Sequence, residues 1–213
     1  MQPEPKNPFK SASLVGQFAI RTCAKGMHLI SRGDSRQTVY YVLKGTFGAT
    51  MYSQQGKKLS LGRMERGDAF GELSAIDGLG RAVTVEALTD AEVMCIERNA
   101  FLSVVMSDPA YTLWLLERVT KRLRQMTDKV FELSVMSVRQ CLLAELCREA
   151  GGTEPVGDDG FILMPTHSEL ASRIGTNRET VTREIANLQR NDAIETKGRS
   201  FKILKDDQIQ HAW

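Results

Sequence analysis

Apolar residues recur with two different spacings along this chain of 213 residues. Between residues 18 and 96, short apolar or alternating runs such as TVYYVLKGTFGATMY and AEVMCIE are separated by Gly, Asp and Gln. The separating residues recur about every 8 to 12 positions, which is typical of short antiparallel strands joined by turns. This segment is expected to form a small antiparallel sandwich or roll. The following residues, 97–107, predict a short helix.

A long helical period begins after Asp108-Pro109 and continues to about Met136. Its apolar positions are separated alternately by three and four residues, which is the a/d pattern of a coiled-coil seam. These positions are Leu116, Val119, Leu123, Met126, Val130 and Leu133. A long helix packed on its own domain is the alternative, but the stretch is longer than a small roll could cover. We therefore expect a parallel homodimer formed through this helix.

Residues 134–138, SVMSV, weaken helix propensity and predict a joint. An amphipathic helix resumes over residues 138–150, and the Gly-Gly pair at 151–152 is expected to end it. A loop is expected over residues 151–160.

Residues 166–188 predict two short helices with a tight turn between them. Gly175 ends the first helix, because glycine tolerates the positive φ of the position after a helix. The candidate N-caps are Thr166 or Ser168 for the first helix and Thr176 or Asn177 for the second. Helix, glycine turn and helix form the spacing of a helix-turn-helix. The segments on either side of Lys197-Gly198-Arg199 predict a two-stranded wing.

The exposed face of the second predicted helix favours DNA over a purely structural role. This face carries Arg178, Glu179, Thr182 and Arg183. Arginine bonds both acceptors of a guanine edge and glutamate accepts from cytosine N4, so the first turns of a recognition helix use such residues. A three-helix packing unit is the alternative, but it gives no reason for this face. The predicted partner is double-stranded DNA.

The overall charge of +2 does not identify a nucleic-acid partner. Residues 137–213 hold ten basic against twelve acidic residues, whereas the window 165–205 holds eight against five. The positions of the charges therefore carry more information than their sum.

The four cysteines form no CxxC pair and lie beside no metal-spaced histidine, so reduced thiols and no metal are expected. No apolar run spans a bilayer and the N-terminus lacks a secretory signal, which predicts a soluble cytoplasmic chain without a membrane partner. An enzyme is disfavoured, because no Ser/His/Asp arrangement, metal cluster or P-loop is visible.

The stretch FGELSAIDGLGRAVTVEA, residues 70–87, places one acid and one base in a glycine-rich apolar segment. A carboxylate at Glu72 suits a hydroxyl donor, and the guanidinium fork of Arg81 suits phosphate oxygens. A simple ion pair between the two is the alternative, but burying it without a third partner costs a free energy on the order of several kcal/mol. A pocket for a hydroxylated anion is therefore expected.

Together, these segments resemble the Crp/Fnr family of bacterial transcription regulators, over about residues 14–205. In that family an N-terminal β-roll binds the effector, a long helix dimerises and a winged helix-turn-helix reads DNA. The resemblance implies an α+β fold with domains at 1–107, 108–136 and 137–213. Residues 70–85 also resemble the phosphate-binding cassette of the regulatory subunits of cyclic-AMP-dependent protein kinase.

By this resemblance, Glu72 accepts a hydrogen bond from a ribose 2′-hydroxyl and Arg81 pairs with a cyclic phosphate. Ala82 offers no hydroxyl, so cyclic AMP is favoured as the allosteric effector, with cyclic GMP as the alternative. Thr127 matches an adenine-contacting position, whereas Met126 replaces a hydroxyl residue there. The implied ligand-binding residues are Gly71, Glu72, Leu73, Arg81, Ala82, Val83, Arg122, Met126 and Thr127.

The segment NRETVTRE matches the family's recognition helix and implies half-sites resembling TGTGA. The implied DNA-binding residues are Thr166, His167, Ser168, Asn177, Arg178, Glu179, Thr180, Thr182, Arg183, Lys197 and Arg199. RNA polymerase is a further implied partner. Cyclic nucleotide is expected to fix the joint at 134–138 and to present the two recognition helices about 34 Å apart.

Three readings remain open from the sequence. The roll can respond to cyclic GMP or another effector, the chain can bind DNA without any effector, or a nucleotide-binding module can act without DNA.

Overall fold

The structure is a computed structural model that describes residues 18–152, 155–156 and 159–204. These residues divide into two compact units, the first containing residues 18–53 and 60–125 and the second residues 54–59 and the described chain from 126 onward. Each unit has its own hydrophobic core. The predicted domain boundaries at 107 and 136 stay a prediction.

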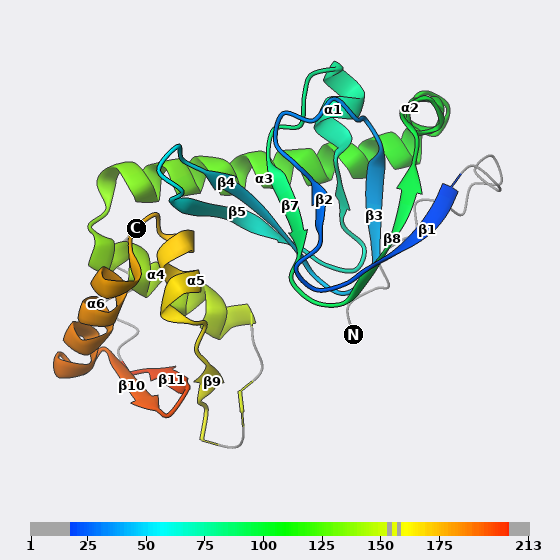
Figure 1. The fold of residues 1–213 in the computed structure, drawn as a ribbon. Coiled ribbons are helices and arrows are strands. Elements are labelled where there is room, and N and C mark those ends of the chain that lie inside the picture. The colour runs from blue at the N-terminus through cyan, green and yellow to red at the C-terminus, as the bar shows by residue number, and fades with distance from the viewer. Residues whose placement is uncertain (1–17, 153–154, 157–158, 205–213) are drawn as a thin grey trace. The chain divides into compact units, whose positions relative to one another are not determined.

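The first unit contains two four-stranded sheets (Figure 1). One sheet has the order β1-β8-β3-β6, formed by Phe18–Cys23, Ala91–Ile96, Val39–Lys44 and Ala69–Phe70. The other has the order β2-β7-β4-β5, formed by His28–Ile30, Thr84–Ala87, Phe47–Tyr52 and Lys58–Met64. The pairs β1–β8, β3–β8, β3–β6, β2–β7 and β4–β7 are antiparallel, as the alternating runs predict.

Strand β3 is buried on both faces, which explains why its sequence is apolar throughout rather than alternating. Tyr40 and Val42 pack in one core cluster with residues of the second sheet, such as Phe47. Val39 and Tyr41 pack in another with residues of the helices α2 (Arg98–Ser107) and α3 (Pro109–Val135). The helix predicted over 97–107 is therefore present and covers one face of the first sheet.

A short helix, α1 (Glu72–Asp77), interrupts the strands where the sequence predicted only strands and turns. Its six residues are too few to show a helical period, so the prediction was wrong at this point. Glycines in the left-handed region flank it, Gly71 at φ 86° and Gly78 at φ 76°. At Gly71 an added Cβ would lie 2.8 Å from the Arg81 Nη1 atom, so a side chain there would displace this guanidinium.

Helix α3 is continuous over 27 residues. Its start is fixed by Asp108, whose carboxylate accepts hydrogen bonds from the amides of Ala110 and Tyr111. Tyr111 and Leu115 are buried in the cluster on the first sheet. Along the predicted seam, Leu116, Leu123, Val130 and Leu133 are exposed in the single chain, while Val119 and Met126 are half-buried.

The second unit holds α4 (Val138–Gly152), β9 (Ile162–Leu163), α5 (His167–Arg173), α6 (Arg178–Arg190), β10 (Ile194–Lys197) and β11 (Ser200–Ile203). Helix α3 ends at Val135 and α4 begins at Val138, so the helical structure is interrupted within the predicted joint. Two expectations were wrong in detail. Helix α4 continues through Gly151 and Gly152, because a last helical turn tolerates glycine. The wing has a third strand, since β9 pairs with β11.

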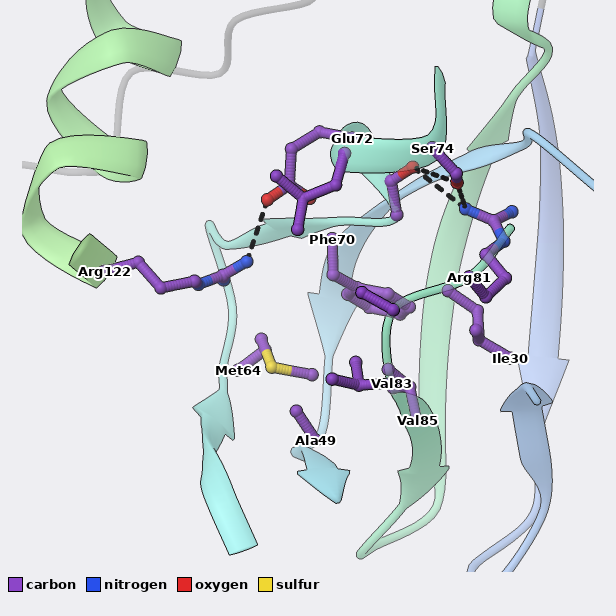
Figure 2. A pocket seen from close by; sticks show the side chains of 13 residues that line it. Ile30, Ala49, Met64, Phe70, Glu72, Ser74, Arg81, Val83, Val85 and Arg122 are labelled. Atoms are coloured by element: carbon purple, nitrogen blue, oxygen red, sulfur yellow. Dashed lines mark hydrogen bonds and ion pairs between the residues drawn. The ribbon is translucent and has the colours of Figure 1, made fainter. Parts of the chain in front are cut away.

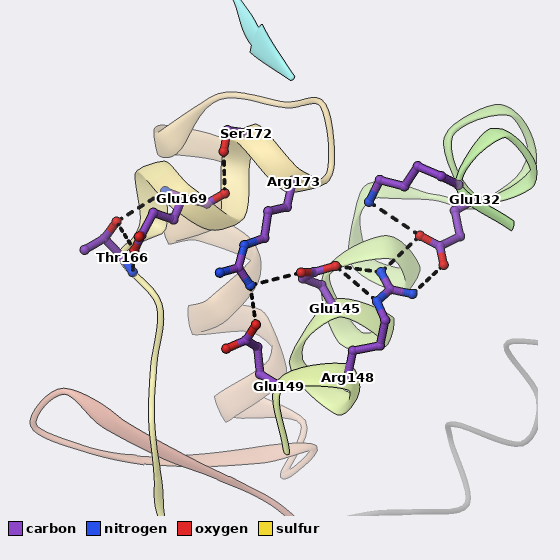
Figure 3. A network of polar contacts seen from close by, with 9 residues as sticks. Glu132, Glu145, Arg148, Glu149, Thr166, Glu169, Ser172 and Arg173 are labelled. Atoms are coloured by element: carbon purple, nitrogen blue, oxygen red, sulfur yellow. Dashed lines mark hydrogen bonds and ion pairs between the residues drawn. The ribbon is translucent and has the colours of Figure 1, made fainter. Parts of the chain in front are cut away.

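A series of ion pairs links three helices of the second unit (Figure 3). Arg148 on α4 binds Glu132 near the end of α3 with its Nη1 atom, at 2.5 Å. It also donates to Glu145 at 2.6 Å, and Glu145 accepts from Arg173 on α5 at 3.1 Å. Glu132 is only 1% exposed. We call Lys129, Glu132, Glu145, Arg148, Glu149 and Arg173 the charge network.

Helix α5 begins with a capping box. The Thr166 hydroxyl accepts from the Glu169 amide at 3.2 Å, and the Glu169 carboxylate accepts from the Thr166 amide at 2.8 Å. Thr166→Ala is expected to lower the free energy of unfolding by about 0.5–2 kcal/mol, measured by urea denaturation. Ser168→Ala, at an exposed position one residue into the helix, should change it by less than about 0.5 kcal/mol. Equal losses in both variants would contradict the cap.

Candidate functional site: a pocket in the roll and a helix-turn-helix face

A pocket in the first unit lies between both sheets, α1 and α3 (Figure 2). Its empty space, part of it open to solvent, is about 400 Å³, within the usual range for small-molecule sites. The lining residues are Ile30, Ala49, Met64, Phe70, Gly71, Glu72, Leu73, Ser74, Arg81, Ala82, Val83, Val85 and Arg122.

Glu72 is the first residue of α1 and is only 3% exposed. Its Oε1 atom accepts a hydrogen bond from Arg122 Nη1 at 2.9 Å, so α3 contributes directly to the pocket. Its Oε2 atom is buried and accepts no hydrogen bond from any described residue. A buried carboxylate oxygen without a donor is unfavourable, and a ligand hydroxyl that donates to it would remove that cost.

Arg81 is 4% exposed and its guanidinium is held by neutral oxygen atoms. Nη1 donates to the Gly71 carbonyl at 2.9 Å and to the Ser74 hydroxyl at 2.7 Å, and Nη2 donates to the Thr38 carbonyl at 2.6 Å. Burial lowers the pKa of Arg81 below its ordinary value. Among the described residues no carboxylate lies within ion-pair distance of it.

The sequence left open a simple ion pair between Glu72 and Arg81, and the structure does not form it. Figure 2 shows Arg122 and Arg81 approaching α1 from opposite sides, with Glu72 bound to the first and Ser74 to the second. The two charged groups are therefore separate recognition points of one pocket. An anion can pair with Arg81 while a hydroxyl binds Glu72.

The rest of the lining is almost wholly apolar. Ile30, Ala49, Met64, Phe70, Val83 and Val85 provide side chains without hydrogen-bonding groups. Such walls suit the faces of a ring, while orientation comes from the few polar groups. The pocket therefore suits a ligand that has an anionic group, a hydroxyl group and a flat apolar ring. A nucleotide with an accessible ribose hydroxyl has all three.

Several predicted ligand residues lie elsewhere or have a lesser role. Leu73 and Ala82 line the pocket with side chains that are otherwise exposed. Met126 and Thr127 belong to the second unit and are not among the lining residues. Their predicted contact with a base stays a prediction.

In the second unit, the predicted recognition helix is α6, and Arg178, Glu179, Thr182 and Arg183 are exposed on it. Asn177 is its N-cap and accepts from the Thr180 amide at 2.8 Å. This local bond gives Asn177 a structural function whether or not it also contacts DNA.

Helix α5 contacts the recognition helix through His167. Its Nδ1 atom lies 2.8 Å from the Thr182 hydroxyl, and Thr182 donates in turn to the Arg178 carbonyl at 3.0 Å. Which of these two groups donates depends on the tautomer of the imidazole. The exposed residues Thr166 and Ser168 lie at the same end of α5.

In the wing, Lys197 and Arg199 are exposed, and Lys197 pairs with Asp159 at 3.1 Å. Such an exposed pair is weak, so Lys197 can exchange Asp159 for a phosphate at little cost. Among the described residues, no three His, Cys, Asp or Glu side chains are grouped as metal ligands.

Comparison with known proteins decides the family. The cyclic nucleotide-binding domain family matches residues 20–108, which contain α1 and all of the pocket-lining residues except Arg122, and the Crp-like helix-turn-helix domain family matches residues 138–211. The chain belongs to the Crp/Fnr family. It is therefore a DNA-binding transcription regulator with a cyclic-nucleotide-binding domain, and this family consists of regulators rather than enzymes. The predicted family, fold class and absence of an enzyme activity are confirmed.

Curated relatives agree with this assignment. The "cAMP-activated global transcriptional regulator CRP" of Salmonella typhimurium is 28% identical over 180 residues, covering 82% of this chain and 84% of that protein. The "cAMP-activated global transcriptional regulator Vfr" of Pseudomonas aeruginosa is 27% identical over 184 residues, covering 83% and 85%.

Solved structures agree in fold. The c-di-GMP responsive regulator CLP of Xanthomonas campestris has a TM-score of 0.80 at 21% identity and covers 91% of this chain and 97% of its own. TTHA1359 of Thermus thermophilus, described as a transcriptional regulator of the CRP/FNR family, has a TM-score of 0.74 at 23% identity and covers 91% and 97%. None of the described helices is long and apolar enough to cross a membrane.

Sequence reasoning missed the groups that hold Arg81. Ser74 lies within the quoted cassette, but a single serine in a mixed segment gives no signal of its own. Thr38 contributes through its backbone carbonyl, 43 positions away from Arg81. The charge network was missed as well, although Glu145 and Arg148 are three residues apart on α4.

Proposed function

We propose that this chain is a homodimeric transcription regulator activated by cyclic AMP, which binds in the pocket of the roll. The observation that carries the proposal is that one pocket contains both a buried acceptor without a donor and a buried cation without an anion among the described residues. The buried Oε2 atom of Glu72 lacks a donor, and the buried Arg81 lacks an anion. A ribose 2′-hydroxyl provides the donor and a cyclic phosphate provides the anion.

Two observations favour cyclic AMP over cyclic GMP. Ala82 beside the phosphate-binding arginine provides no hydroxyl that could bond a guanine amino group. The curated relatives named above are both described as activated by cAMP. CLP is described as responsive to c-di-GMP, so the family fold by itself does not fix the effector.

The Glu72–Arg122 contact suggests how the effector acts. Arg122 lies on α3, so a hydroxyl that binds Glu72 changes the surroundings of a residue on the proposed dimerisation helix. We propose that two chains pair along the seam of α3, where four of the six predicted positions are exposed. The effector would then stabilise one arrangement of the dimer by binding it more tightly than the other.

We propose that α6 reads half-sites resembling TGTGA in an inverted repeat. In this proposal Arg178 and Arg183 bond guanine edges and Glu179 accepts from cytosine N4, and the support is that all three are exposed in the first two turns of α6. Thr166, Thr180 and Lys197 are the proposed phosphate contacts. RNA polymerase as a partner and a cytoplasmic location stay predictions.

The first experiment is a calorimetric titration with cyclic AMP and cyclic GMP, with and without a duplex that carries inverted TGTGA half-sites. Cyclic AMP should bind and should switch on duplex binding. Duplex binding that is unaffected by either nucleotide would support the helix-turn-helix assignment and reject cyclic nucleotide as the effector. A preference for cyclic GMP would show that Ala82 does not determine the base.

Glu179→Gln should relax base preference at one position of each half-site and leave nucleotide binding unchanged. The loss of discrimination is expected to be about 1–3 kcal/mol, because an amide both donates and accepts where a carboxylate only accepts. Binding to single-substituted duplexes measures it. Glu195→Gln, at an exposed position of the wing strand β10, is the matched control. A uniform loss across all duplexes would instead assign Glu179 to a general contact.

A further inference from the structure

Ser74 lies beneath the phosphate-binding arginine and is itself buried. It is 3% exposed, and it stands three residues after Gly71, one turn along α1. Its hydroxyl accepts the shortest hydrogen bond that Nη1 of Arg81 makes, at 2.7 Å. No part of the nucleotide is needed to explain this contact, because it is formed between two groups of the chain.

The direction of the hydrogen bonds follows from the donors available. A serine hydroxyl has one hydrogen, and Ser74 Oγ donates it to the Gly71 carbonyl at 3.3 Å. Its lone pairs are therefore turned toward Arg81. The same Gly71 carbonyl also accepts from Nη1, at 2.9 Å, so carbonyl and hydroxyl together fix both hydrogens of that nitrogen.

The remaining donors of Arg81 form a defined set. A guanidinium has five N–H groups, of which the described contacts use two on Nη1 and one on Nη2. The N–H of Nε and the second N–H of Nη2 are left. With the Thr38 carbonyl on the Nη2 hydrogen that faces Nη1, these two groups form the Nε–Nη2 edge of the guanidinium plane, which is the fork that binds two oxygens of one phosphate.

We propose that Ser74 is a positioning residue, which holds the Arg81 guanidinium so that this fork faces the cyclic phosphate. The inference rests on the proposed function, since the phosphate belongs to the proposed effector. The three acceptors Gly71 O, Thr38 O and Ser74 Oγ are neutral, so they orient Arg81 without neutralising its charge. Of the three, only Ser74 acts through its side chain, so it is the position where substitution can test the arrangement.

The test is calorimetric titration of the full chain with cyclic AMP and with 2′-deoxy cyclic AMP. Ser74→Ala should lose about tenfold in affinity for both nucleotides, because one charge-assisted hydrogen bond to Arg81 is removed and two remain. The ratio between the two affinities should not change, because it reports the contact of Glu72 with the 2′-hydroxyl. Ser74→Thr, which keeps the hydroxyl, should stay within about threefold of the unaltered chain.

Thr84→Val is the matched control. Thr84 is a buried hydroxyl residue of β7 that accepts from the Arg32 amide and does not line the pocket. Its replacement should leave both affinities nearly unchanged.

Two outcomes would overturn the role of Ser74 alone. One is an unaltered affinity in Ser74→Ala. The other is loss of the preference for the 2′-hydroxyl, which would show that the substitution acts by disturbing α1 and Glu72. Absence of nucleotide binding by the unaltered chain would reject the proposed effector, and the role of Ser74 with it.

Discussion

Replacing Arg81 with glutamine is expected to lower the affinity for cyclic AMP at least about 100-fold, equivalent to about 2.7 kcal/mol. Glutamine keeps a donor for the Gly71, Ser74 or Thr38 oxygen but removes the charge. The guanidinium is buried and its described partners are neutral, so its charge is available for a phosphate. An interaction between desolvated charges contributes more than an exposed pair of the same geometry.

The calorimetric titration of Arg81→Gln requires a control that alters charge without entering the pocket. Arg36→Gln serves, because Arg36 is exposed and pairs with Asp34 in the adjoining loop. Its effect on cyclic AMP affinity should remain below about threefold, since exposed pairs contribute little. DNA binding in the presence of cyclic AMP should be lost in Arg81→Gln and kept in Arg36→Gln. Unchanged cyclic-AMP-dependent DNA binding in Arg81→Gln would refute the assignment of Arg81.

The sequence pattern predicts the elements of this fold where the period is long or the end signals are strong. Helix α3 shows its seam over four turns or more, and the helix-turn-helix shows a cap before each helix and a glycine between them. Short elements lack such signals. Helix α1 has six residues and β9 has two, so neither shows a period, and their formation depends on packing with distant residues.

Local sequence pattern alone predicted only Glu72 and Arg81 of the candidate site, whereas the resemblance to the Crp/Fnr family added Gly71, Leu73, Ala82, Val83 and Arg122, which also line the pocket. Glu72 and Arg81 stand out because each is a single charge in a glycine-rich apolar segment. The residues that orient them do not stand out. Arg122 reaches Glu72 across 50 positions of sequence, and Arg81 is held partly by a backbone carbonyl, which any residue type could provide. Local patterns cannot report contacts made by the tertiary fold.

The charge network of the second unit raises the question of whether buried ion pairs stabilise this domain. A buried pair gains little over apolar packing, but removing one partner leaves a charge without compensation. Glu132 is the most buried acid of the network, with Arg148 at 2.5 Å and Lys129 more distant at 3.7 Å. Burial raises the pKa of Glu145, but the hydrogen bond and charge of Arg148 outweigh it and leave that pKa below its ordinary value.

Arg148→Met should therefore lower the free energy of unfolding by about 2–4 kcal/mol at neutral pH. This loss is somewhat smaller than the loss expected for a fully buried ion pair, because Arg148 is partly exposed. Urea unfolding followed by circular dichroism measures the loss, and amide exchange in α4 and α5 localises it. Arg139→Met, which breaks the more exposed pair with Glu184, should cost less than about 1 kcal/mol.

The pH dependence of Arg148→Met gives an independent check. A carboxyl whose pKa is lowered on folding contributes stability above its ordinary pKa and loses it as the pH falls through the lowered value. Arg148 causes this lowering at Glu145, so the variant lacks part of that contribution. The difference in stability between the unaltered chain and the variant should shrink as the pH falls below about 4. A constant difference from pH 7 to pH 3 would assign the loss to the packing of the Arg148 side chain instead of its charge.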